Sequence, residues 1–186
     1  MNVVNSEHIK LIENKINEII FLRADDGEIA SYEEEEEFDK MMNKICEHTQ
    51  SKIISNGSYR GLIEYLGYAI KVPFFTVSEY QNKSEKEIWD KHIKDSEIEK
   101  YYIPCLLFYK GYSVYAYGDA FQSFHDYLNR KDEMDAIIQM SKQYLYDRAC
   151  SMLFLEDLRL ANNEEQLRWK NWGMFKGNTV IFDYAL

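Results

Sequence analysis

Four short segments of this sequence hold the residues whose types and order could do chemistry. In chain order, the segments are Tyr68–Lys71, Asn82–Trp89, Gln166–Asn171 and Ile181–Ala185. A lysine ammonium attracts anions such as phosphate, and carboxylate and amide oxygens are ligands that magnesium accepts. Lysine, asparagine and aspartate all occur in these segments, so the segments contain residue types that can bind an anion or a metal ion.

The histidines and cysteines are not arranged for catalysis or metal binding. The four histidines are far apart and none lies at a metal-ligand spacing from another: His8, His48, His92 and His125. The three cysteines, Cys46, Cys105 and Cys150, are also far apart and form no CxxC pair. This pattern predicts neither a disulfide framework nor a zinc site, and it favours a reducing, cytoplasmic environment.

Composition narrows the class of protein. The chain has 186 residues, of which 46% are hydrophobic and 29% are charged, so we expect a folded protein with one core. Its 32 acidic residues against 22 lysines and arginines give a formal charge of -10, which argues against direct nucleic-acid binding. No apolar run approaches the roughly 18 residues of a membrane span, so we expect a soluble protein without a membrane partner.

The hydrophobic pattern predicts an α+β fold. An apolar residue every three or four positions predicts a helix over about Glu7–Phe21, and Ser31 is placed to cap a second helix that begins with Glu33–Glu37. The run Lys52–Val77 is expected to form a sheet, with turns at its three glycines. The later elements are expected to be a helix over Asn82–Ile93, two strands within Tyr101–Tyr117, a long helix from near Asp132 and a hairpin over Trp172–Tyr184. We divide the chain into a helical pair, residues 1–50, and a second region, 51–186, packed together as a single domain.

In this order, the elements and segments resemble the protein-kinase family, and they are most like its small bacteriophage members. Tyr68-Ala69-Ile70-Lys71 resembles the strand whose lysine binds nucleotide phosphates, here Lys71. Gly57 and Gly61 occupy the place of the glycine-rich phosphate loop, although the full three-glycine pattern is absent. The following helix offers Glu85, with Glu87 as the alternative, to pair with Lys71. The resemblance implies an antiparallel N-lobe sheet with helices and a reduced helical C-lobe.

The last two segments resemble the kinase catalytic loop and metal-binding strand. They imply Asn171 and Asp183 as magnesium ligands beside a bound ATP, with Gln166 at the place of the catalytic acid. A neutral amide cannot accept the substrate's proton, so this register predicts impaired catalysis. A second register uses Asp157 as the base, but its asparagine lies 21 positions before Asp183 rather than 12. The shorter interval suits one tight hairpin, and we prefer it.

The resemblance predicts a truncated, catalytically impaired protein, because the chain ends directly after Asp183 where kinases continue into the substrate-binding helices. We expect it to act by binding a host or self protein, with ATP and magnesium as possible ligands. One alternative is an acidic inhibitor or nucleic-acid mimic that uses Glu33–Glu37 against a host enzyme. Another is an active phosphotransferase on a small substrate with Asp157 as base. Each residue also has an ordinary interpretation; Lys71, for instance, could be a strand charge that prevents aggregation.

Overall fold

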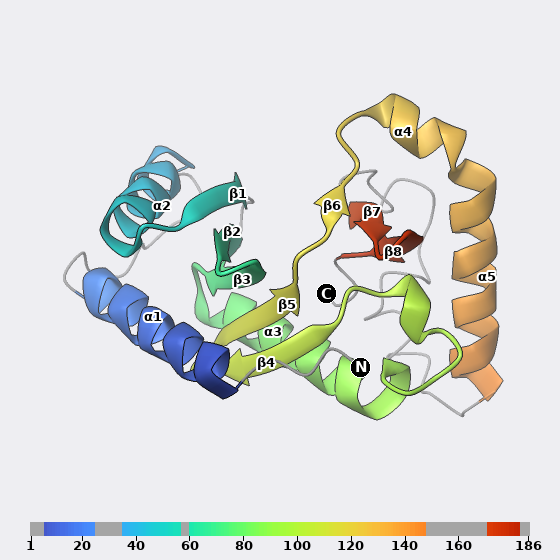
Figure 1. Cartoon of the computed structure of the whole chain (residues 1–186), viewed down its shortest axis with the longest axis horizontal. Helices are drawn as coiled ribbons and strands as arrows, with labels where there is room; N and C mark the ends of the chain where they lie inside the picture. The colour runs from blue at the N-terminus through green and yellow to red at the C-terminus, as the bar shows by residue number, and fades with distance from the viewer. Residues whose placement is uncertain (1–5, 25–34, 57–59, 148–170, 183–186) are drawn as a thin grey trace. The chain divides into compact units, whose positions relative to one another are not determined.

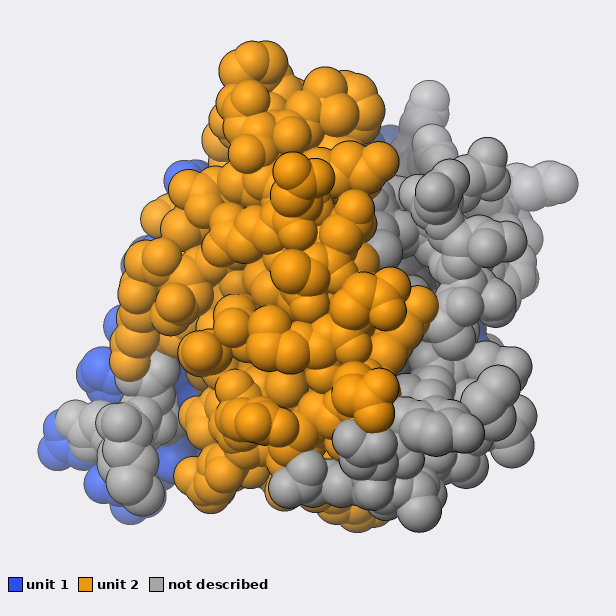
Figure 2. Space-filling model, turned by 90° about the vertical axis from the view of Figure 1, so that its right-hand side faces the viewer, with its two compact units in different colours: residues 1–86, 105–116 blue, residues 87–104, 117–186 orange. Residues whose placement is uncertain are grey.

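The computed structural model describes residues 6–24, 35–56, 60–147 and 171–182, and it has an α+β fold (Figure 1). The chain divides into two compact units. Unit 1 comprises residues 1–86 and 105–116, and unit 2 comprises residues 87–104 and 117–186 (Figure 2). The expected mixture of helices and antiparallel strands is confirmed.

Unit 1 is built on a five-stranded antiparallel sheet with the strand order β1-β2-β3-β5-β4. Its strands are β1 (Lys52–Asn56), β2 (Arg60–Tyr65), β3 (Tyr68–Pro73), β4 (Cys105–Tyr109) and β5 (Tyr112–Ala116). Its helices are α1 (Ser6–Ala24), α2 (Glu35–Thr49) and α3 (Thr76–Ile88), of which the last two residues of α3 belong to unit 2. The helix α3 therefore follows β3 directly and precedes the β4–β5 hairpin.

The first two helices share a hydrophobic core with the sheet. Each helix buries an apolar stripe, which comprises Ile12, Ile16 and Ile19 on α1 and Phe38, Met41, Met42 and Ile45 on α2. Ile63 pairs with Ile70, and Ile70 pairs with Val114, so the three side chains lie on one face of the sheet and join that core. The guanidinium of Arg23, near the end of α1, donates hydrogen bonds to the Phe74 carbonyl and the Tyr112 hydroxyl. The N-terminal helices are therefore packed into the same unit as the sheet.

The prediction of a turn at Gly61 is wrong. Gly67 lies in the turn between β2 and β3 with a φ of 75°, as expected, whereas Gly61 is paired with Val72 inside β2. A Cβ atom on Gly61 would overlap the end of the Met42 side chain, so Met42 of α2 packs where the strand carries no side chain. Gly57 lies outside the described residues.

The start of the third helix also differs from the expectation. The sequence predicted strand as far as Val77 and helix only from Asn82, but α3 begins at Thr76. Pro73 ends β3, and the Phe75 carbonyl then accepts the amides of Ser78 and Glu79. The apolar, β-prone run before the helix concealed this boundary. The helix continues into a π-helical turn at Trp89–Ile93, where Trp89 and Ile93 are buried.

Unit 2 holds the remaining elements. They are the 3-10 turn Glu99–Tyr101, β6 (Asp119–Ala120), α4 (Phe124–Asn129), α5 (Lys131–Asp147), β7 (Trp172–Phe175) and β8 (Asn178–Ile181). The strands form a small antiparallel sheet in the order β6-β7-β8, which contains the expected C-terminal hairpin. The helix α5 begins at Lys131, next to the expected start near Asp132, and it buries Ile137, Ile138 and Tyr144.

The helices that the structure describes give no candidate for a membrane span, because none combines the necessary length with the necessary apolar character.

Replacing Ile16 by alanine should lower the free energy of unfolding by about 2–4 kcal/mol, because Ile16 has no exposed surface and the change leaves a cavity. Leu11 on the same helix is 45% exposed, so Leu11→Ala should change it by no more than about 0.5 kcal/mol. Urea unfolding followed by circular dichroism measures both. Equal effects would show that α1 is not part of the core.

Candidate functional site

The face of the sheet that carries Lys71 is the one turned away from the core of isoleucines and valines. Lys71 pairs with Leu62 on β2 and with Ser113 on β5, and its neighbour Ile70 points to the opposite face. Tyr115 lies two residues beyond Ser113 on β5 and therefore shares the face of Lys71. The alternation of the strands thus separates a polar face from an apolar one.

Glu85 of α3 binds Lys71 through both carboxylate oxygens. The Lys71 ammonium lies 2.8 Å from Oε1 and 2.7 Å from Oε2. The Glu85 side chain has no exposed surface, and that of Lys71 is 11% exposed. The structure therefore brings together the lysine and the glutamate that the sequence pattern selected. The alternative, Glu87, is 48% exposed and pairs with Lys91 one turn further along.

Two more side chains donate to the same carboxylate. Arg60, the first residue of β2, places Nη1 3.0 Å from Glu85 Oε1. The Tyr115 hydroxyl donates to Glu85 Oε2. The Tyr115 ring also faces the ammonium of Lys71, which lies 4.7 Å from the ring centroid and gains a cation–π contact. Glu85 is thus held by donors from three neighbouring strands.

Asn82 connects this arrangement to the β4–β5 turn. It precedes Glu85 by three residues, so both side chains lie on one face of α3. Its Oδ1 accepts from Arg60 Nη1 at 3.1 Å, and its Nδ2 donates to the Gly111 carbonyl at 2.8 Å. We call the five residues the Glu85 cluster; they are Arg60, Lys71, Asn82, Glu85 and Tyr115.

The electrostatics of the cluster follow from burial. Taking a carboxylate out of water costs several kcal/mol, and only charge-assisted hydrogen bonds of good geometry offset that cost. Glu85 receives such bonds from Lys71 and Arg60 in addition to the one from Tyr115. The cluster can hold the ammonium of Lys71 in a fixed position, which is what binding an anion at a defined place requires.

The other candidates from the sequence lie in β2, in unit 2 or outside the described residues. Gly61 lies in β2 and contacts Met42 on the apolar side of the sheet. Asn171 belongs to unit 2, directly before β7, and its carbonyl accepts the Phe182 amide at 2.8 Å. The remaining candidates lie outside the described residues: Gly57, Asp157, Gln166 and Asp183. No group of three or more His, Cys, Asp or Glu side chains in the described part of the chain could hold a metal ion.

Sequence reasoning missed Arg60, Asn82 and Tyr115. Helical spacing could have found Asn82, because it lies three positions before Glu85. Strand alternation could have placed Tyr115 with Ser113. Only the cross-strand register could have placed Arg60 and Tyr115 beside Lys71, and one sequence does not reveal a register.

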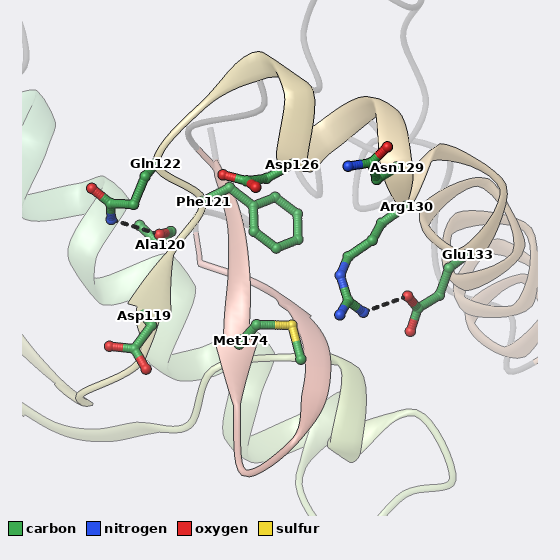
Figure 3. A pocket seen from close by; sticks show the side chains of 9 residues that line it. All are labelled: Asp119, Ala120, Phe121, Gln122, Asp126, Asn129, Arg130, Glu133 and Met174. Carbon is green, nitrogen blue, oxygen red and sulfur yellow. Dashed lines mark hydrogen bonds and ion pairs between the residues drawn. The ribbon is translucent and has the colours of Figure 1, made fainter.

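A separate cavity of about 570 Å³ lies within unit 2 (Figure 3). Its lining mixes apolar, amide and charged groups, among them Phe121, Asn129 and Met174. Arg130 bonds Glu133 at 3.0 Å across one edge of the cavity. The carboxylate of Asp126, another lining residue, is engaged in the capping box of α4. This mixture does not select one ligand chemistry, so the Glu85 cluster is the better candidate site.

Comparison with known proteins gives no relative for this chain: no family model, no curated protein and no solved structure matches it. The function is therefore argued from the geometry of the Glu85 cluster and from the order of the elements.

Glu85→Gln should lower the free energy of unfolding by about 3–5 kcal/mol, because it removes the carboxylate that Lys71 and Arg60 share and leaves both cations poorly compensated. Glu87→Gln is the matched control on the same helix. Its side chain is half exposed, so we expect a change within about 0.5 kcal/mol. Chemical denaturation of both variants measures the difference. Similar values for the two would contradict a structural ion pair at Glu85.

Proposed function

We propose that this chain is a kinase-like protein that binds the phosphates of a nucleotide at Lys71 and works by binding rather than by catalysis. The observation that carries the proposal is the pair of hydrogen bonds that the Lys71 ammonium donates to the buried Glu85 carboxylate. A lysine held in this way on a sheet, by a glutamate from the next helix, is what the kinase family uses to position phosphates.

The order of the elements supports the same proposal. A strand that carries Lys71 leads into the helix that carries Glu85, and two further strands follow. The second of these, β5, returns to pair with β3 beside Lys71. This order agrees with what the resemblance to the kinase N-lobe implies, and it comprises three strands and one helix: β3, α3, β4 and β5.

Lys71 is suited to phosphate because its side chain keeps some exposed surface while Glu85 fixes the position of the ammonium. Its side chain is 11% exposed, whereas the carboxylate below it has no exposed surface. An anionic ligand therefore meets the cation and not the carboxylate. A fixed cation needs no reorganisation when the phosphate arrives, which favours binding.

The resemblance adds Asn171 and Asp183 as magnesium ligands. An amide and a carboxylate oxygen suit magnesium, which would neutralise part of the phosphate charge when bound. The same resemblance implies Gln166 at the position of the catalytic base, so the proposed protein holds its nucleotide and binds a partner protein without transferring phosphate.

ATP with magnesium should raise the Tm of the wild-type protein by about 3–6 °C at ten times its Kd, because binding to the folded state adds stability. Lys71→Met should remove the shift, measured against that variant's own Tm without nucleotide. Lys52→Met is the control, since Lys52 lies exposed on β1 of the same sheet. Differential scanning fluorimetry measures all three. If millimolar ATP leaves the wild-type Tm unchanged, the nucleotide proposal is wrong and the α+β fold still stands.

Wild-type protein with radiolabelled ATP and magnesium should transfer no phosphate to itself or to small hydroxyl compounds, because Gln166 cannot accept a proton. Asp157→Ala and Gln166→Ala serve as a pair of probes in the same assay. Transfer that disappears in Asp157→Ala and persists in Gln166→Ala would replace this proposal with an active phosphotransferase that uses Asp157 as its base.

A further inference from the structure

Arg60 occupies the strand next to that of Lys71 and lies on the same face of the sheet. In the antiparallel register Arg60 pairs with Pro73 and Leu62 pairs with Lys71. Because directly paired residues and residues two apart share a face, the side chains of Arg60 and Lys71 both rise from the polar side. Arg60 is therefore the diagonal neighbour of Lys71 on the adjacent strand.

The two cations meet at one oxygen atom. Arg60 Nη1 lies 3.0 Å from Glu85 Oε1, and Lys71 Nζ lies 2.8 Å from the same atom. The two nitrogens are therefore no more than 5.8 Å apart, the sum of these two distances. Two like charges this close repel each other, so an anion must hold them together, and within the cluster that anion is Glu85.

Satisfying Glu85 does not require the second cation. Without Arg60, the carboxylate still accepts two bonds from Lys71 and one from Tyr115. Arg60 and Lys71 are also alike in their exposure, with 10% and 11% of the side chain exposed above a carboxylate that has none. The two most exposed side chains of the cluster are therefore two cations of different shape.

We infer that Arg60 is a second phosphate-binding residue beside Lys71, and that this site takes ligands with at least two linked phosphoryl groups. The inference rests on the proposed function, in which Lys71 binds phosphate. A guanidinium presents a planar fork to phosphate oxygens, whereas an ammonium acts as a point charge. Asn82 holds Arg60 Nη1 in place, so the fork has a fixed direction before the ligand arrives. Neighbouring phosphoryl groups of one ligand can then meet the two cations. The number of phosphates, rather than the nucleobase, therefore decides the affinity.

Titration calorimetry with ATP, ADP, AMP and inorganic triphosphate tests this inference at one magnesium concentration. Wild-type protein should bind ATP and inorganic triphosphate more tightly than AMP. Arg60→Gln should weaken both triphosphates by about tenfold to a hundredfold, the value of one lost charged contact, and AMP by less than about threefold. Arg130→Gln, which removes an arginine of unit 2, should leave all affinities unchanged. A role of Arg60 in structure alone would lower every affinity by the same factor, and that result would overturn the inference.

The inorganic ligand separates this inference from the nucleotide proposal. Binding of inorganic triphosphate that depends on Arg60, without binding of ATP, would support the inference and reject the nucleotide. Binding of ATP with the same ratio of ATP to AMP affinity in wild type and Arg60→Gln would keep the nucleotide and reject the inference. No binding of either ligand would reject both.

A measurement on the wild-type protein covers the case in which Arg60→Gln does not fold. The side-chain ¹⁵Nε signal of Arg60, assigned with the conservative variant Arg60→Lys, should shift when inorganic triphosphate is added and shift less with inorganic phosphate. An Arg60 signal that triphosphate does not move would overturn the inference.

Discussion

A carboxylate with no contact to water is the constraint around which unit 1 is arranged. Burying Glu85 would cost several kcal/mol if its oxygens lacked strong donors. The donors are Lys71 on β3, Arg60 on β2 and Tyr115 on β5, so the bonds form only when three strands are in register and α3 is at the correct height. One ionised side chain therefore links the register of the sheet to the position of the helix.

Hydrophobic burial on the apolar face of the sheet offsets the free-energy cost of burying Glu85. The core that α1 and α2 form with the strands buries large side chains, among them Ile16, Met42 and Ile70. Hydrophobic burial of this kind does not depend on direction, so it stabilises the sheet without specifying what the other face carries. The helices brace the sheet from one side, and Gly61 allows α2 to approach it closely. The polar face therefore carries charged and hydrogen-bonding residues, which do not have to supply the hydrophobic stability of the sheet.

Sequence patterns predicted those parts of the fold that depend on local spacing. The apolar stripe of α1 follows from helical period, and the turn at Gly67 follows from the ability of glycine to adopt positive φ. The resemblance to the kinase family also favoured Glu85, which the structure buries. Local spacing could not show that Gly61 lies inside a strand or that Arg60 and Tyr115 meet Glu85, because those facts depend on which strands pair and in what register.

The same geometry bears on how a ligand would act. Arg60 and Lys71 already hold α3 to the sheet through Glu85, so an anion that binds both cations would strengthen the junction of β2, β3 and α3 instead of opening it. Linkage makes this effect reciprocal: any partner that keeps α3 in place would raise the affinity for the anion, and any partner that displaces α3 would lower it by the same factor. A protein that binds nucleotide without turning it over can in this way pass the ligand's presence to a partner, since the two equilibria share the position of one helix.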